Sequence, residues 1–249
     1  MSLQTVLVTG ANRGIGLELV RQLLAEQNPP KHLIATTRPT ANSTELDTLA
    51  AKHQNLHVIH MEGKAYDSFA ASGGVSDQIR QIVGSSGLDT LINNAGILIP
   101  KMLDTITAND MIENFEINTV SPLMLTKALL PQLKMASAQR KTAVVNISSS
   151  IGSIELAKPK PDGQWHSVYA YRCSKAALNM ISQCLSIDLK RDNIYAISMN
   201  PGHLKTDLGG PNAQIEVADG VNGIIKEIKL IDNNSNGRLV NYAGGILPW

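Results

Sequence analysis

The stretch LQTVLVTGANRGIG, residues 3–16, leads from an apolar segment directly into a turn with glycines at positions 10, 14 and 16. Residues 3–9 are typical of a buried strand, and helical periodicity begins at about residue 14. Glycine lets the backbone turn sharply and approach a phosphate, and the N-terminus of a helix supplies unpaired N–H groups. The spacing is G-x3-G-x-G rather than G-x-G-x-x-G, and the alternative is a glycine-rich turn without a ligand. The strand–turn–helix context favours a dinucleotide-binding loop.

Strand and helix patterns alternate along the rest of the chain. This order predicts a Rossmann-like α/β fold, with a doubly wound seven-stranded parallel sheet and helices on both faces. No repeat or linker interrupts the alternation, so residues 1–249 are interpreted as one domain with an irregular insert at 150–168. The predicted strands are 3–9, 32–37, 55–60, 88–92, 142–147, 194–199 and 237–242, and the predicted helices are 14–27, 43–53, 66–84, 108–137, 171–191 and 214–229.

The composition argues against several kinds of partner. The formal net charge is +1, with both signs mixed along the 249 residues, so neither nucleic acid nor a membrane surface is expected as a partner. No apolar run is long enough to span a bilayer, and the first residues lack the pattern of a signal peptide. A cytoplasmic location is therefore expected.

Cysteine and histidine positions predict reduced thiols and no metal. On the predicted helix 171–191, Cys173 and Cys184 would be separated by about 16 Å of rise, too far for a mutual disulfide. His53, His57 and His60 do not have the spacing of metal ligands with carboxylates or thiols, so no metal site is predicted.

A second stretch, HSVYAYRCSKAALN at 166–179, contains two tyrosines and one lysine. Residues four apart share a helix face, so Tyr171 and Lys175 can act as a pair, whereas Tyr169 and Lys175 are six apart and cannot. An ordinary helix start is the alternative, because a tyrosine and a lysine at this spacing occur often by chance.

Taken together, the motifs resemble those of the classical short-chain dehydrogenases/reductases. The resemblance is carried in order by TGANRGIG at 9–16, NNAG at 93–96, NISS at 146–149, YRCSK at 171–175 and NPG at 200–202. Within that family the chain is most similar to the sniffer-type carbonyl reductases and the related C-factor group, through segments such as ISSSIGSI, YAYRCSKAALN and KTDLGG. Any one motif is weak, whereas the ordered set covers the whole chain.

The resemblance implies a catalytic tetrad. Ser149 would donate a hydrogen bond to the substrate carbonyl, and Ser148 is the next candidate for this role. Tyr171 would give the proton, and Lys175 would lower the tyrosine pKa and bind the nicotinamide ribose. Asn118 would hold the water that links Lys175 to solvent. Tyr169 would line the pocket or cap the helix.

The same resemblance implies an NADP(H) site. Arg38 after the second strand and Arg13 in the glycine loop would hold a 2′-phosphate, because no acid is present there to select NADH. Two exposed surface arginines are the alternative. Glu62 would replace the aspartate that relatives place near the adenine, and a backbone group making this contact is the alternative. The full expected set is Gly10, Asn12, Arg13, Gly14, Ile15, Gly16, Arg38, Glu62, Asn93, Ala95, Gly96, Tyr171, Lys175, Pro201, Gly202, Leu204 and Thr206.

The expected function is an NADPH-dependent carbonyl reductase that acts on a small aldehyde, ketone or quinone. Ser149, Trp165 and His203 would contact the substrate, with the insert 150–168 as the wall of its pocket. A solvated loop is the alternative reading of the insert. The rival functions are an alcohol or hydroxysteroid dehydrogenase that works oxidatively and an NADP(H)-binding signalling protein with little catalysis. A homodimer is expected through the helices 108–137 and 171–191, with outer positions that include Met124, Leu125, Leu129, Met180 and Leu185. A place in the core is the alternative for some of these five residues.

Overall fold

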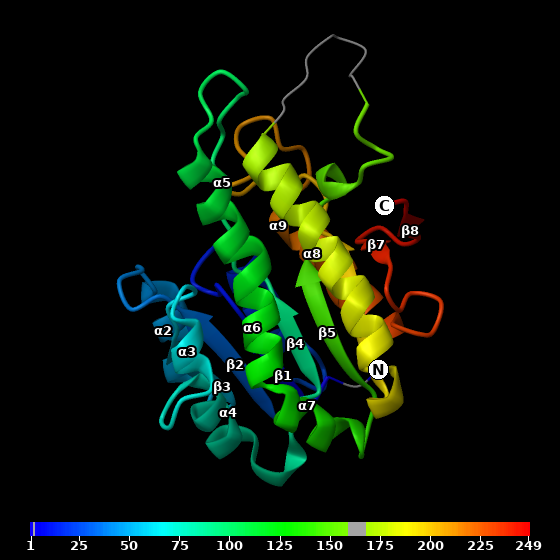
Figure 1. The fold of residues 1–249 in the computed structure, drawn as a ribbon. Helices are drawn as coiled ribbons and strands as arrows, with labels where there is room; N and C mark the ends of the chain where they lie inside the picture. The colour runs from blue at the N-terminus through cyan, green and yellow to red at the C-terminus, as the bar shows by residue number, and fades with distance from the viewer. Residues whose placement is uncertain (2, 159–167) are drawn as a thin grey trace.

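One sheet of eight strands forms the centre of the computed structural model, which describes residues 1, 3–158 and 168–249 (Figure 1). The strand order is β3-β2-β1-β4-β5-β6-β7-β8, and all pairs except β7 with β8 are parallel. This is the doubly wound order, in which the chain starts at β1 and builds outward in both directions. The strands are β1 Thr5–Val8, β2 His32–Thr37, β3 Leu56–His60, β4 Thr90–Asn93, β5 Thr142–Ile147, β6 Ile194–Asn200, β7 Leu239–Asn241 and β8 Ile246–Leu247.

The predicted α/β class and the seven predicted strands are confirmed, and the eighth strand was not expected. β8 is only two residues long and turns back antiparallel to β7. The reversal uses Gly244 and Gly245, both with positive φ, a conformation that glycine adopts without steric penalty.

Helices cover both faces of the sheet and bury two apolar cores (Figure 1). One core takes Leu19 and Leu23 of α1 together with Ile224 of α9. The other takes Ile79 of α4, Leu125 of α6 and neighbours from α7 and the end of α8. The helices are α1 Gly14–Ala25, α2 Thr44–Lys52, α3 Tyr66–Phe69, α4 Val75–Val83, α5 Ala108–Phe115, α6 Ser121–Ala128, α7 Leu130–Ser137, α8 Tyr169–Asp188 and α9 Val217–Leu230; the short turns are η1 Gly84–Ser86, η2 Glu116–Val120, η3 Ser150–Gly152 and η4 Lys190–Asp192.

Two long helices predicted from the sequence are broken in the structure. The predicted helix 66–84 is divided into α3 and α4 by a turn at 70–74. The predicted helix 108–137 contains a π-helical turn, η2, and a second break at Leu129 before Pro131. The π turn inserts extra backbone per turn and so rotates every later side chain about the helix axis.

The packing of the helices corrects the predicted dimer face. Leu125 and Leu129 point into the core and are fully buried. Met124 and Leu185 pack against the same core, and of the five expected outer residues only Met180 is exposed.

Candidate active site

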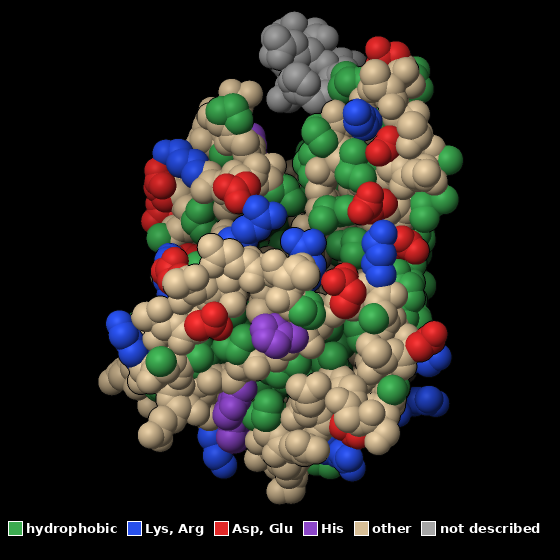
Figure 2. All heavy atoms as spheres, turned by 90° about the vertical axis from the view of Figure 1, so that its left-hand side faces the viewer, with side chains coloured by type: hydrophobic (Ala, Val, Ile, Leu, Met, Phe, Trp, Pro, Cys, Tyr) green, Lys and Arg blue, Asp and Glu red, His purple; other side chains and the backbone are tan. Residues whose placement is uncertain are grey.

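A cleft of about 1450 Å³ opens at the carboxyl ends of β1, β4, β5 and β6. Figure 2 shows the molecule hollowed at this end, between two raised parts. The cleft exceeds the 300–1,000 Å³ typical of pockets for drug-sized ligands, so it has room for a dinucleotide and a substrate together. The predicted site residues that line it are Gly10, Asn12, Arg13, Gly14, Ile15, Arg38, Glu62, Ala95, Gly96, Ser149, Tyr171, Lys175, Pro201, Gly202, His203, Leu204 and Thr206.

The glycine loop is packed tightly against the end of β4. A Cβ at Gly16 would lie 2.3 Å from the carbonyl oxygen of Gly10 and 2.6 Å from Nδ2 of Asn94, so only glycine fits there. Asn94 holds the loop by donating to the carbonyl oxygens of Thr9 and Gly10 at 2.8 and 3.2 Å. The side chain of Arg13, the N-cap residue of α1, makes no capping hydrogen bond, so the first N–H groups of the helix are available to a ligand in the cleft.

Tyr171 and Lys175 lie on the buried face of α8, one turn apart. Tyr171 is 7% exposed and lines the cleft, whereas Tyr169 is the first residue of α8 and does not line it. The Lys175 ammonium lies 5.5 Å from the centroid of the Tyr171 ring and donates to the carbonyl oxygen of Ile147 at 2.7 Å. The helix therefore brings a phenol and an ammonium together at the end of β5.

Burial dominates the protonation of both groups. Burial raises the pKa of Tyr171 above its ordinary value, and burial lowers the pKa of Lys175 to about 8. The expected lowering of the tyrosine pKa by the lysine charge is therefore not the leading effect in this structure. At neutral pH, Tyr171 is a neutral phenol and Lys175 is mostly an ammonium.

The three serines 148–150 have different surroundings. Ser148 is buried, and its hydroxyl bonds to Oδ1 of Asn179 at 2.6 Å, with the carbonyl oxygen of Lys175 at 3.3 Å. Ser149 lines the cleft, and its Oγ accepts from the N–H of Ile151 at 3.3 Å, which leaves its proton available to a ligand. The geometry therefore favours Ser149 over Ser148 as a donor to a substrate.

Contacts that the sequence did not reveal hold Ser149 beside α8. A Cβ at Gly152 would lie 2.8 Å from the backbone carbon of Lys175, so η3 packs directly on the helix. Asn200 accepts from the N–H of Ser150 at 2.9 Å, and Nη1 of Arg172 donates to the carbonyl oxygen of Ile151 at 3.2 Å. The NPG motif contains Asn200, but nothing in the sequence indicated its partner.

Asn118, Asn93 and Gly16 belong to the predicted site but do not line the cleft. Asn118 lies in the π turn, where its amide bonds to both backbone groups of Ile97 at 2.9 Å and donates to Ser174 Oγ at 3.0 Å. It thereby fixes the segment that follows Gly96, and a water relay through it stays a prediction. Asn93 donates to Oδ1 of Asn146 at 2.8 Å inside the sheet, behind the cleft wall.

The adenine end expected from the resemblance contains Arg38, Glu62 and Arg13, all exposed. Arg13 is paired with Asp207 across the cleft, with Nη1 and Oδ2 2.5 Å apart. Lys64, next to Glu62, pairs with Glu116 at 3.0 Å. Arg13, Arg38, Glu62 and Asp207 all line the cleft, and the contact of the first three with the adenine end of a cofactor stays a prediction.

The part of the cleft where the substrate is expected from the sequence is lined by the segments after β5 and β6. His203 contacts the carbonyl oxygen of Gly209 through Nε2 at 2.7 Å, and Thr206 Oγ1 accepts from the N–H of Gly209 at 3.1 Å. His203 is thus a wall residue that braces its own loop. Trp165, with the rest of residues 159–167 of the insert, lies outside the described residues.

Metal-binding clusters and membrane-spanning helices are both absent from the described part of the chain. No three His, Cys, Asp or Glu residues in it are grouped so that they could hold a metal ion. No helix described by the structure is both long and apolar enough to cross a membrane.

Comparisons with known proteins place the fold and its motifs. A family model described as short chain dehydrogenase matches residues 4–216. The NADPH-bound carbonyl reductase from chicken fatty liver is 38% identical and superposes with a TM-score of 0.93, and the carbonyl reductase Sniffer of D. melanogaster is 35% identical with a TM-score of 0.92. Both alignments cover 100% of both chains. C-signal of Myxococcus xanthus is 36% identical over 163 residues, 65% of this chain and 93% of that protein.

Proposed function

Because the chain belongs to the short-chain dehydrogenase family, we propose that it is an NADPH-dependent carbonyl reductase that acts on a small aldehyde, ketone or quinone. One observation carries the proposal: Ser149, Tyr171 and Lys175 line a single cleft together with the uncapped N-terminus of α1. A buried phenol and ammonium beside the ligand, here Tyr171 and Lys175, are typical of a catalytic site rather than of a protein that only binds its ligand.

The residues of the cleft fit NADPH. The free N–H groups at the start of α1 suit the pyrophosphate, and Arg38 and Arg13 suit a 2′-phosphate. Lys175 has donors beyond its bond to Ile147 for the nicotinamide ribose. The chicken carbonyl reductase, 38% identical, is described as NADPH bound. When bound, NADPH supplies the hydride.

The chain's own residues polarise the carbonyl and deliver the proton. The Ser149 hydroxyl donates to the carbonyl oxygen of the substrate, and the Tyr171 O–H gives its proton to that oxygen as negative charge develops there. Lys175, charged and close to Tyr171, stabilises the phenolate that remains. Because Tyr171 is a neutral phenol at neutral pH, its proton is in place to be donated when negative charge develops on the carbonyl oxygen.

The experiment follows NADPH oxidation with a panel of quinones, diketones, aldehydes and steroids. Tyr171→Phe should lower kcat about 10²–10³-fold, as removal of a donor to a developing oxyanion does, while the Kd for NADPH stays within twofold. Tyr169→Phe is the matched control and should keep near-full activity. Loss of activity in Tyr169→Phe with retention in Tyr171→Phe would refute the assignment.

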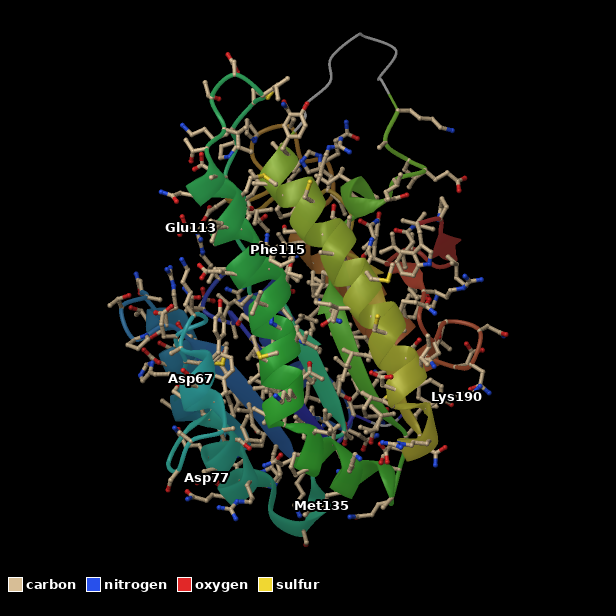
Figure 3. The ribbon with its side chains drawn as sticks, in the orientation of Figure 1. Asp67, Asp77, Glu113, Phe115, Met135 and Lys190 are labelled. Carbon is tan, nitrogen blue, oxygen red and sulfur yellow. The ribbon has the colours of Figure 1, made fainter. Side chains whose placement is uncertain are left out.

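We also propose self-association as a homodimer and a cytoplasmic location. The outer faces of α5 and α8 expose Ile112, Phe115, Met180 and Ile187, and Phe115 is labelled on α5 in Figure 3. Exposed apolar side chains on neighbouring helices are typical of subunit contacts. Cys173 and Cys184 are exposed and unpaired, which favours a reducing compartment.

A further inference from the structure

Asn179 lies on α8 one turn beyond Lys175, on the same buried face as Tyr171 and Lys175. Residues 171, 175 and 179 are spaced four apart, so their side chains share one face of the helix. All three are buried, at 7%, 3% and 4% exposure. Tyr171 and Lys175 line the cleft, whereas Asn179 does not. Asn179 therefore extends this row of polar side chains away from the cleft and into the interior.

The side chain of Asn179 contacts Ser148, the residue that precedes Ser149. The Ser148 hydroxyl donates to Oδ1 of Asn179 at 2.6 Å, and the carbonyl oxygen of Lys175 is a second acceptor at 3.3 Å. Both side chains are buried, and a hydrogen bond in such surroundings is stronger than one exposed to water. The bond therefore joins the end of β5 to α8, which lies against that strand (Figure 1).

The orientation of Ser148 determines that of Ser149. The backbone of Ser149 is extended, with φ −164° and ψ 148°, and successive side chains of an extended backbone point to opposite sides. As long as Ser148 points to α8, Ser149 points the other way, where it lines the cleft. On the following residue, the N–H of Ser150 donates to Oδ1 of Asn200 at 2.9 Å. Two amide side chains thus hold Ser149 in place through its two neighbours in sequence.

The amide of Asn179 is less favourable for the folded protein than an apolar side chain would be. Its Nδ2 is buried and has no hydrogen-bond partner among the described residues, and a buried donor without a partner is destabilising. Ser148 does not need Asn179 for its own hydrogen bonding, because the carbonyl oxygen of Lys175 remains as an acceptor. Stability alone therefore gives no reason for an amide at this position, which points to a functional one.

We propose that Asn179 is a positioning residue, which acts through Ser148 to orient the Ser149 hydroxyl toward the substrate carbonyl. This inference rests on the proposed carbonyl reductase function and adds a residue beyond the expected tetrad. A donor that is misplaced by about 1 Å can lower the rate about 10²-fold. Without Asn179, the longer contact of Ser148 with the carbonyl oxygen of Lys175 remains, so the displacement of Ser149 is smaller and kcat should fall about tenfold.

The test compares Asn179→Leu with the wild type, because leucine has the same branched shape without the polar atoms. In NADPH-oxidation kinetics, kcat should fall about tenfold, while the Kd for NADPH stays within about twofold because Tyr171 and Lys175 are unchanged. The urea concentration at the midpoint of unfolding should stay the same or rise, because the unpaired donor is gone. A loss of kcat without a loss of stability is the result that a purely structural role would not give.

A double-variant cycle with Ser149→Ala tests whether Asn179 acts through Ser149. If it does, Asn179→Leu should change kcat by less than about twofold in the Ser149→Ala protein, since the group that it positions is gone. An equal loss of kcat in both backgrounds would overturn the inference. Asn179→Ser is the second variant in case leucine prevents folding, because its side chain is too short to reach Ser148, and the same cycle applies to it.

Ser182→Ala is the matched control, since Ser182 is another fully buried polar residue on α8. Its hydroxyl contacts Nδ2 of Asn146 and Oγ of Ser198 at 2.8 Å each, and none of the three residues lines the cleft. Ser182→Ala should lower the urea midpoint and leave kcat within about twofold of the wild type, because it leaves a buried donor without its acceptor far from the reacting groups.

The outcomes separate the inference from the proposed function. If Asn179→Leu behaved like Ser182→Ala, with a lower urea midpoint and an unchanged kcat, Asn179 would be structural. The inference would then be overturned, and the proposed function would stand. If the wild type binds NADPH but reduces no carbonyl in the panel, the proposed function fails, and the inference fails with it.

Discussion

The ammonium of Lys175 donates to the carbonyl oxygen of Ile147 at 2.7 Å from a fully buried position. Burial lowers the pKa of Lys175 from 10.5 to about 8. Below pH 8 the lysine is charged in both the folded and the unfolded chain, and the folded chain bears the cost of a buried charge. The difference corresponds to about 3 kcal/mol.

The stability of the cofactor-free protein should therefore rise with pH between 8 and 10. In that range the unfolded chain binds the lysine proton and the folded chain has lost it, which is the condition for stability to increase with pH. Above pH 10, Tyr171 acts in the opposite sense, because its raised pKa makes the folded chain keep a proton that the unfolded chain loses. Urea unfolding of the wild type and Lys175→Met should show the rise only in the wild type. If the free energy of unfolding of the two proteins changed in parallel between pH 8 and 10, the rise would not come from Lys175.

Ser149→Ala and Ser148→Ala should fail in different ways. Ser149→Ala removes a donor to the substrate, so kcat should fall about 10²–10³-fold with little change in Tm. Ser148→Ala leaves the buried Oδ1 of Asn179 without its donor and should cost about 1–3 kcal/mol of stability, with a smaller effect on kcat. Thermal unfolding and NADPH-oxidation kinetics of both variants decide between the two serines, and a stable but inactive Ser148→Ala would reverse the assignment.

The order of the strands and the positions of the motifs could be read from the sequence, because strand periodicity and glycine turns are local signals. The two breaks in the long predicted helices differ in how far the sequence signals them. Gly73 and Gly74 visibly mark the turn between α3 and α4, and a Cβ at Gly74 would lie 2.0 Å from the carbonyl oxygen of Ser68. The π turn around Asn118 has no comparable signal, since a single extra residue per turn leaves the composition of a helix unchanged.

The contacts of the candidate site likewise fall into those that local sequence predicts and those that depend on tertiary packing. Tyr171 and Lys175 were predictable because their pairing is set within one helix. The bonds of Ser148 to Asn179 and of Asn200 to Ser150 join segments about 30 and 50 residues apart and depend on tertiary packing. The same holds for the pKa of Tyr171, which follows from burial and not from the neighbouring lysine.

Met180→Asp should weaken the proposed dimer. Met180 is 64% exposed on the outer face of α8, so a charge there costs little in the monomer but would be desolvated in a subunit contact. Light scattering at micromolar concentration should show a dimer for the wild type and a monomer for Met180→Asp. Leu230→Asp, at 60% exposure on α9, is the control and should stay dimeric. A monomeric wild type would contradict the proposal.

Asp207→Asn should tighten the binding of NADPH and leave NADH unaffected. In the structure Arg13 is paired with Asp207, and both side chains are more than 60% exposed. A 2′-phosphate must compete with this carboxylate for the guanidinium, which binds phosphate in a planar fork. Because exposed ion pairs are weak, removing the competitor should lower the Kd for NADPH only about two- to fivefold.

Arg13→Ala should weaken NADPH binding about tenfold, and Asp207→Asn should then have no further effect, since the two changes act through one guanidinium. Arg38→Ala should weaken NADPH binding independently, so that its effect adds to that of Asp207→Asn. Titration calorimetry of the single and double variants with NADPH and NADH, at low and high salt, measures these effects. The effect of Asp207→Asn should shrink at high salt, because the ion pair of Arg13 and Asp207 is exposed. An equal gain for NADH would show that Asp207 acts on a part of the cofactor other than the 2′-phosphate.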